Sequence, residues 1–310
     1  MVPTVLELSS EGYTIHVERG FYVLSNSEGE AGKVPIEDVG VLLLSASGGF
    51  VSKPVLTRLL EQGGTAVVCG PGYTPMGMLS PISGNGETSA RVKVQIAATA
   101  PLKKRLWQTI VQAKLANQSA VLERFGEMSR SREILGIAEG VRSGDPDNRE
   151  AWGARVYWPA LLKKSFRRSD ANNPVNGMLN YGYAIVRACA ARALCASGLL
   201  PMFGVMHGSA RNPFALADDI MEPFRPLVDA VVRHLVDFGI CEVVPAAKRA
   251  LAGVIGLDSE TQRGTSPVSE ALMDMAQSLV DSYKEKANRL CIPVVRIPNA
   301  SIVHVPAPAI

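Results

Sequence analysis

The sequence lacks the features that mark secreted disulfide-rich proteins, zinc proteins and membrane proteins. Its five cysteines are odd in number and scattered, and no Cys-x-x-Cys pair occurs among them. No stretch approaches the roughly 20 uninterrupted apolar residues that a membrane-spanning helix needs. The N-terminus also has no basic segment followed by an apolar signal core. We therefore expect reduced, buried cysteines and a cytoplasmic protein.

Two sequence signatures of common enzyme classes are missing as well. No glycine-rich phosphate loop of recognised spacing is present. Without a Gly-x-Ser-x-Gly elbow, a serine hydrolase that uses Ser209 beside His207 is a weak interpretation.

Tyr181 and Tyr183 fall in a helical, alanine-rich stretch, so we interpret them as packing residues with a bonded hydroxyl. The alternative for these tyrosines, the nucleophile of a tyrosine recombinase, is less favoured.

What is present indicates two domains of different type. The chain has 310 residues, of which 47% are hydrophobic, enough for a large core and for two domains. Up to about residue 80 the pattern is mainly that of strands, with alternation at Tyr13, Ile15 and Val17, an apolar run at 39–44, one helix at 54–62 and another strand at 65–69. We expect an α+β protein: a small β-rich domain (1–80), a linker (81–88), a larger all-α catalytic domain (89–291) and an extended tail (292–310).

Several helices of the second domain have clear sequence signals. A long helix rich in small residues is expected from Asn176 to Ser197, and a last one from about Ser266 to Ala287. Another is expected to start at Asn212-Pro213, a favourable N-cap and first-turn pair, and to carry an apolar stripe as far as residue 235.

Acidic residues on two expected helices are candidates for chemistry. Asp219 and Glu222 are three positions apart, so they share a helix face outside the apolar stripe. Glu150 falls at the third position of a helix for which Asp147 is a good N-cap. Each has a structural alternative: Glu150 fits a capping box, and the acids around Glu222, with Asp218 among them, fit a solvated first turn helped by the helix dipole. His207 is as well explained by a loop histidine bonded to backbone as by a metal ligand.

Positive charge is concentrated in the middle of the chain. The net charge is only +3, but residues 101–170 carry 14 basic and 8 acidic residues. Such a surface suits phosphate backbones, although it also fits a solvated helix face. The candidate DNA-backbone contacts are Lys103, Lys104, Arg105, Lys114, Lys163, Lys164, Arg167 and Arg168.

Together, the segments around Glu150 and at 207–226, the runs 102–107 and 141–148, and Asn-Gly-Met-Leu-Asn-Tyr-Gly-Tyr at 176–183 resemble a known family. They resemble the CRISPR-associated spacer-acquisition integrase, the first protein of the Cas series, especially its form from systems with a single RNA-guided effector nuclease. The resemblance implies that Glu150, His207 and Glu222 bind the catalytic metal, with Asp219 as a neighbouring support. The chain departs from the family pattern around the histidine, where Met206 and Gly208-Ser209 replace a second histidine and an Arg-Asn pair.

The resemblance also implies an activity and partners. One imidazole and two carboxylates accept Mg²⁺ or Mn²⁺. The expected reaction is insertion of short DNA fragments at the edge of a CRISPR repeat, by attack of a 3′-hydroxyl on a phosphodiester, and nicking of branched DNA. Expected partners are double-stranded and branched DNA, a second copy bound through the β-rich domain, a dimer of the small second acquisition protein, and the effector nuclease. The alternative is a non-catalytic DNA-binding scaffold of the same fold.

Overall fold

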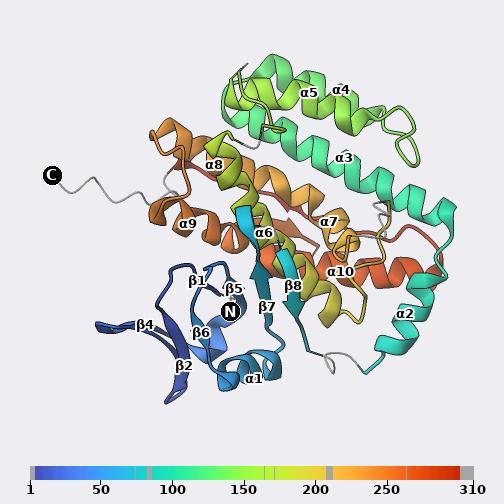
Figure 1. The fold of residues 1–310 in the computed structure, drawn as a ribbon. Coiled ribbons are helices and arrows are strands. Elements are labelled where there is room, and N and C mark those ends of the chain that lie inside the picture. Colours follow the sequence, from blue (N-terminus) through green and yellow to red (C-terminus); the bar gives the residue numbers. More distant parts are fainter. Residues whose placement is uncertain are drawn as a thin grey trace. The chain divides into compact units, whose positions relative to one another are not determined.

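The computed structural model describes residues 4–73, 75–81, 86–163, 165–170, 172–206, 212–262 and 264–300. The chain divides into two compact units, unit 1 (Met1–Gly86) and unit 2 (Glu87–Ile310). A β-rich N-terminal region followed by a mostly helical region is confirmed (Figure 1). The expected linker lies partly outside the described residues, which resume at residue 86. Among the described helices, none combines the length and the apolar character of a membrane span.

Unit 1 contains two four-stranded sheets. The first has the order β1 (Thr4–Leu8), β5 (Val39–Leu44), β7 (Thr65–Cys69), β8 (Pro75–Leu79), with β8 antiparallel to β7 and the other pairs parallel. The second has the order β4 (Gly29–Pro35), β3 (Phe21–Asn26), β2 (Thr14–Glu18), β6 (Phe50–Val51). Helix α1 (Lys53–Glu61) contacts β2, β5 and β7. The short 3-10 turns η1 (Ile36–Asp38) and η2 (Pro71–Tyr73) complete the unit.

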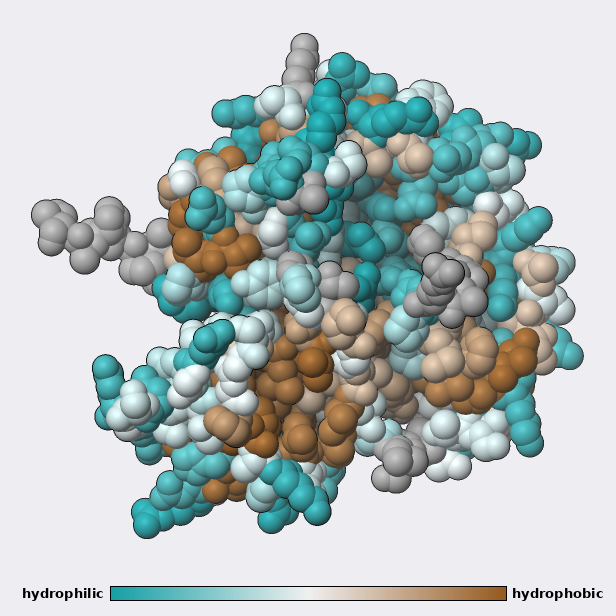
Figure 2. Space-filling view, viewed as in Figure 1, coloured by the Kyte–Doolittle hydropathy of each residue, from teal (hydrophilic) through white to brown (hydrophobic). Residues whose placement is uncertain are grey.

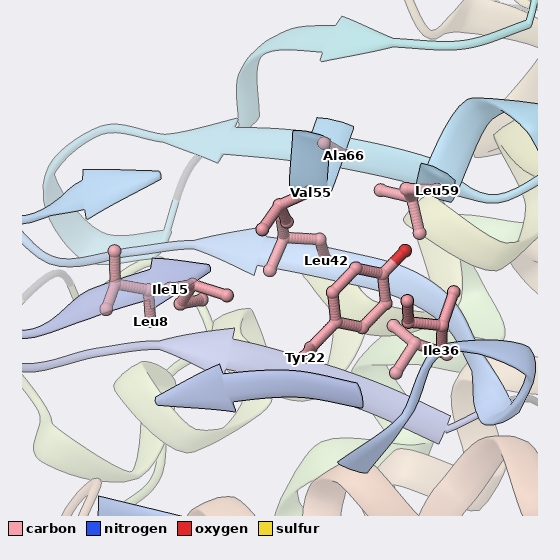
Figure 3. Packing of buried hydrophobic residues seen from close by; sticks show 9 residues of the cluster. Leu8, Ile15, Tyr22, Ile36, Leu42, Val55, Leu59 and Ala66 are labelled. Carbon is pink, nitrogen blue, oxygen red and sulfur yellow. The ribbon is translucent and has the colours of Figure 1, made fainter. Parts of the chain in front are cut away.

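The core of unit 1 confirms the alternation seen in the sequence. Ile15 of β2 and Tyr22 of β3 are fully buried and meet Leu42 of β5 and Leu59 of α1 (Figure 3). The sequence pattern predicted β2, β5, β7 and α1, but it missed β1, β4, β6 and β8. Strand β4 is mostly exposed and has the sequence GEAGKVP, so it shows no apolar alternation.

Unit 2 is built around α6 (Pro174–Ala196), a helix that is apolar on nearly all sides and therefore buried. It contacts α7 (Ala215–Met221), α8 (Arg225–Asp237), α9 (Pro245–Ala252) and α10 (Val268–Glu285). Asn173 caps α6 by accepting a hydrogen bond from the backbone N–H of Val175. Helices α6 and α10 agree with the sequence prediction, including the apolar face of α10.

Three further helices form a second layer of unit 2. The long α3 (Ala100–Arg124) follows α2 (Thr88–Ile96) and contacts both α4 (Met128–Glu139) and α5 (Arg149–Leu162) (Figure 1). The same helix also contacts α8 and the short 3-10 turn η3 (Glu222–Phe224). A second turn, η4 (Gly253–Gly256), joins α9 to the segment that follows it. Helix α3 thus contacts both α5, which carries Glu150, and η3, which carries Glu222.

The expectation of an all-α second domain needs one correction. A small sheet of order β10 (Gly264–Pro267), β9 (Asp258–Thr261), β11 (Val294–Val295) lies within unit 2. Its strands have two to four residues, and β9 and β10 are polar. The sequence therefore has no alternation of apolar and polar residues there that would predict strands. Strand β11 belongs to the expected tail, of which residues 301–310 lie outside the described residues.

Two glycines of α6 test how tightly this helix is packed. A methyl group at Gly182 would lie 2.5 Å from Cγ1 of Val228, a stiff and buried side chain, whereas at Gly177 it would meet only Val243, at 3.4 Å. We expect Gly182→Ala to lower the free energy of unfolding by about 1–3 kcal/mol, because overpacking outweighs helix propensity. Gly177→Ala should leave it unchanged or raise it by up to about 1 kcal/mol. Urea denaturation followed by circular dichroism measures both, and equal effects would contradict the close packing.

Candidate active site

Three elements of unit 2 bring two carboxylates onto one ammonium group. Lys114 Nζ, on α3, lies 2.5 Å from Oε1 of Glu150 at the start of α5 and 2.6 Å from Oε2 of Glu222 in η3. Arg225 approaches Glu222 from α8, with 3.1 Å between its Nε and Oε1. The side chains of Lys114 and Glu222 are 13% and 5% exposed and that of Glu150 is 25% exposed, so the cluster is buried except on the Glu150 side.

The charge on Lys114 follows from its neighbours. Burial lowers the pKa of the Lys114 ammonium group, but the Glu222 and Glu150 carboxylates outweigh burial, and the net effect raises the pKa above its ordinary value. Lys114 is therefore a permanent cation at neutral pH. The two carboxylates share it as they would share a metal ion.

Glu150 is positioned by the turn that starts α5. The carboxylate of Asp145 accepts hydrogen bonds from the backbone N–H groups of Arg149 (2.9 Å) and Glu150 (3.0 Å). The predicted cap, Asp147, instead pairs with the exposed Arg142 at 2.8 Å. Glu150 is thus the second helical residue rather than the third, and its carboxylate contacts Lys114. The capping-box interpretation of Glu150 is therefore wrong.

Close contact between α3 and α5 keeps Glu150 within reach of Lys114. At Gly153, one turn after Glu150, a methyl group would overlap the fully buried side chain of Leu115, the neighbour of Lys114. The glycine lets the two helix backbones approach, so a short glutamate spans the remaining distance.

Glu222 is positioned by a break in the helix that the sequence predicted as continuous. Pro223 and Pro226 lack the N–H groups that an α-helix needs, and the chain forms α7, η3 and α8 in place of one helix. Asn117, one turn after Lys114 on α3, donates a 2.7 Å hydrogen bond to the carbonyl of Pro223. One face of α3 therefore holds both Glu222 and the turn that carries it.

Asp218 and Asp219 hold the chain on both sides of the segment 207–211. Asp219, fully buried, accepts hydrogen bonds from the backbone N–H groups of Val205 (2.6 Å) and Met206 (3.1 Å). Asp218, 7% exposed, accepts hydrogen bonds from Arg187 (2.6 Å) and from the side chain of Asn212 (2.8 Å). Both carboxylates have structural partners, and the alternative of a solvated first turn is wrong. His207 itself lies outside the described residues.

A buried carboxylate that was not predicted from the sequence, that of Asp229, is bonded to the tyrosine against which Arg225 packs. Asp229 of α8 accepts hydrogen bonds from the hydroxyl groups of Tyr157 (3.0 Å) and Tyr183. The Arg225 guanidinium lies 4.8 Å from the centroid of the Tyr183 ring, in cation–π contact. Tyr183 is therefore a packing residue with a bonded hydroxyl, and burial holds the pKa of that hydroxyl well above its ordinary value. An acidic residue among the apolar positions of α8 was the only sequence signal for this network.

The predicted DNA contacts fall into two groups. Lys104 and Arg105 are exposed near the start of α3, and Lys103 beside them is half-buried and donates to the carbonyl of Gly204 at 3.5 Å. Helix α5 ends at Leu162, so the second group follows the helix rather than ending it. In that group Lys163 and Arg167 are exposed, and Lys164 lies outside the described residues. For Lys114 the prediction of a DNA contact is wrong, because its side chain is buried against the carboxylates of Glu150 and Glu222.

Arg168, of the second group, is tied into the structure. It donates to the amide oxygens of Asn176 (3.1 Å) and Asn180 (2.6 Å), and its guanidinium lies 5.4 Å from the centroid of the Tyr183 ring. A cavity of about 1100 Å³ lies beside it. The cavity combines basic and aromatic side chains, among them Arg130, Arg155, Trp158, Phe166, Arg167 and Arg168. In Figure 2 the surface over α4 and α5 is mostly hydrophilic.

The Asp229 network predicts a pH dependence of stability. Burial raises the pKa of Asp229 from 3.8 to about 6, although hydrogen bonds from Tyr183 and Tyr157 oppose the rise. Between these values the folded protein holds a proton that the unfolded chain has released, so stability falls as pH rises. We expect the free energy of unfolding to fall by up to about 3 kcal/mol more in the wild type than in Asp229→Asn between pH 4 and pH 7. Denaturation curves at several pH values measure the difference, and parallel pH profiles would refute the assignment.

Comparisons with known proteins agree with the motifs. The family model described as CRISPR associated protein Cas1 matches residues 6–243. The CRISPR-associated endonuclease Cas1 of Neisseria meningitidis serogroup C (strain 8013) is 36% identical over 276 residues, which cover 88% of this chain and 90% of that relative.

Solved structures share the fold. A casposase bound to integration product aligns with a TM-score of 0.77 and 19% identity, covering 93% of this chain and 92% of that chain. A chain of a Cas6-RT-Cas1–Cas2 complex aligns with a TM-score of 0.73 and 17% identity, covering 96% of this chain and 36% of that chain. At these identities the likeness shows the fold alone. From the family match and the 36% identical relative, the chain belongs to the Cas1 family of CRISPR-associated proteins.

Proposed function

We propose that this protein is a metal-dependent DNA integrase and endonuclease of CRISPR adaptation. The observation that carries the proposal is the convergence of Glu150 and Glu222 on one cation position. Asp219, one turn before Glu222, holds the backbone of Val205 and Met206 directly ahead of His207. The name of the 36% identical relative, an endonuclease, supports the same activity, and so does the casposase bound to integration product.

The residues present fit Mg²⁺ or Mn²⁺. Two carboxylate oxygens already converge on a single positive charge, and oxygen ligands of this kind suit hard divalent ions. Glu150 and Glu222 would hold the metal with His207, whose nitrogen shifts the preference toward Mn²⁺. A bound metal would supply Lewis-acid stabilisation of the charge that develops on a phosphodiester.

The proposed reaction is a transesterification. The 3′-hydroxyl oxygen of a short DNA fragment forms a bond to a phosphorus atom at the edge of a CRISPR repeat, while the bond from that phosphorus to a 3′-oxygen of the target strand breaks. The proton of the attacking hydroxyl leaves, and the departing oxygen gains one, so no energy source is needed. The hydroxyl of Tyr183 is bonded to Asp229, which agrees with a mechanism that forms no covalent bond to the enzyme.

Basic side chains would hold the DNA. Lys104 and Arg105 on α3, together with Lys163 and Arg167 after α5, are exposed to solvent, where their positive charges can meet phosphates. In the cavity beside Arg168, guanidinium groups lie together with Trp158 and Phe166. Arginine and aromatic side chains together suit single-stranded or branched DNA, whose bases can stack.

The assembly is proposed to contain two copies of this chain joined through unit 1. Unit 1 exposes large apolar side chains, and Figure 2 shows apolar atoms gathered over its strands. These side chains are Phe50, Val68, Met76 and Leu79. Two strands have to be joined a fixed distance apart, so we propose that a dimer of the small second acquisition protein bridges two such pairs, as the Cas1–Cas2 composition of a structural neighbour supports. The effector nuclease would help to choose fragments.

A strand-joining assay tests the proposed function. The reaction contains Mn²⁺, a fragment with a free 3′-hydroxyl and a supercoiled plasmid with a CRISPR repeat, with and without the small second protein. We expect Glu150→Gln, Glu222→Gln and His207→Ala to lower joining by at least about a hundredfold, because each removes a proposed ligand of the metal that stabilises the developing charge. Glu270→Gln, an exposed glutamate on α10, is the matched control and should join like the wild type.

Three results would contradict the proposal. The first is equal joining by the three site variants and the wild type, and the second is joining of a fragment with a blocked 3′ end. The third is DNA binding by the wild type without joining or nicking under any of these conditions, which would favour the scaffold. The departure from the family pattern at Met206 and Gly208-Ser209 is the observation that keeps the scaffold under test.

A further inference from the structure

The Lys114 ammonium group occupies the position that a metal held by Glu150 and Glu222 would need. Its nitrogen lies 2.5 Å and 2.6 Å from one oxygen of each carboxylate. Carboxylate oxygens bind Mg²⁺ at about 2.0–2.1 Å, so a metal shared by the same two oxygens would lie nearly where the ammonium nitrogen lies. Both cations cannot occupy this position at once.

The place of Lys114 in the fold shows that its charge is needed there. The side chain is 13% exposed on the inner face of α3, and burial of an unpaired ammonium group would be costly. The two carboxylates would in turn repel each other if no cation lay between them. Arg225 offsets part of the charge of Glu222, to which it lies 3.1 Å away, but Glu150 comes from a different helix and contacts Lys114.

We propose that Lys114 is the resident counter-cation of the metal-free site, and that a divalent metal binds by displacing its ammonium group from between Glu150 and Glu222. This inference rests on the proposed function, because it requires a metal at this site. The flexible four-carbon stem of lysine allows the ammonium group to turn aside without movement of α3. The displaced charge then needs another anion, and the DNA phosphate brought by the proposed reaction is that anion. Lys114 is in this sense a positioning residue that holds the site together before the metal arrives.

Displacement has a measurable cost for the wild type. The metal has to break two ion pairs before it forms its own bonds, so the affinity measured for the metal is lower than the affinity of the two carboxylates alone. Removal of the ammonium group should therefore raise the measured affinity for the metal. Without metal, repulsion between the Glu150 and Glu222 carboxylates would destabilise the variant. Metal binding would therefore stabilise the variant more than it stabilises the wild type.

Mn²⁺ titration without DNA tests the proposal on the full chain. Lys114→Met keeps the length and apolar stem of the side chain and removes its charge. We expect at least about tenfold tighter Mn²⁺ binding in isothermal titration calorimetry, because a competing charge in the site is gone. We also expect a lower melting temperature than wild type in EDTA and a larger rise with Mn²⁺. Lys93→Met, an exposed lysine on α2, is the matched control and should behave like the wild type.

A second measurement uses the wild type and so does not depend on the folding of a variant. In ¹⁵N-lysine NMR the ammonium signal of Lys114, protected by its two ion pairs, should be visible without metal and should shift or vanish when Mg²⁺ is added. The backbone amide signals of labelled lysines at exposed positions such as Lys93 should not change.

The outcomes separate this inference from the proposed function. Equal or weaker Mn²⁺ binding by Lys114→Met, or an unchanged Lys114 signal at saturating Mg²⁺, overturns the displacement of Lys114. The proposed function still stands in that case, provided that Glu150→Gln weakens metal binding. If neither the wild type nor Lys114→Met binds metal, both proposals fail.

Discussion

Two ionised carboxylates are costly to bury side by side unless positive charge lies between them. In this protein that charge is the ammonium group of Lys114, and the two acids come from positions far apart in the chain. Helix α3 supplies the cation, α5 supplies Glu150 and the turn η3 supplies Glu222. The packing of unit 2 around α3 therefore has to satisfy an electrostatic condition as well as a steric one. The same condition supports the proposed divalent metal, because the acids that need a cation are already brought together.

Backbone features rather than the acids themselves set this geometry. Asp145 starts α5 so that Glu150 lies in its first turn, and Gly153 lets α5 approach α3. Pro223 interrupts the chain between α7 and α8, and its carbonyl is fixed to α3 by Asn117. Outside this group, Asp219 fixes the backbone that leads to His207. Residues other than the proposed ligands thus decide where those ligands lie, and the conformation of the turns matters as much as the acidic residues.

Much of the fold was predictable, because long periodic segments carry their own signal. The strands around Ile15 and the helices α6 and α10 follow from local patterns that agree with their burial. The short polar strands β9 and β10 were missed because they lack such a pattern. For the candidate site, motif resemblance singled out Glu150 and Glu222, which the structure brings onto one ammonium group, whereas spacing alone favoured capping for Glu150. The position of Lys114 between the two acids was not predictable, because Glu150 and Glu222 come from other elements and a lysine on a helix is usually a surface charge.

The central claim is that Glu150, Glu222 and His207 together bind one divalent metal. The most direct test is pulsed electron paramagnetic resonance of the protein loaded with one equivalent of Mn²⁺, with histidine labelled by ¹⁵N. The account predicts coupling of the Mn²⁺ electron spin to a histidine nitrogen, lost in His207→Ala, and loss of the bound Mn²⁺ signal when Glu150 and Glu222 are both replaced by glutamine. Bound Mn²⁺ without histidine coupling, or Mn²⁺ retained by the double glutamine variant, would contradict it.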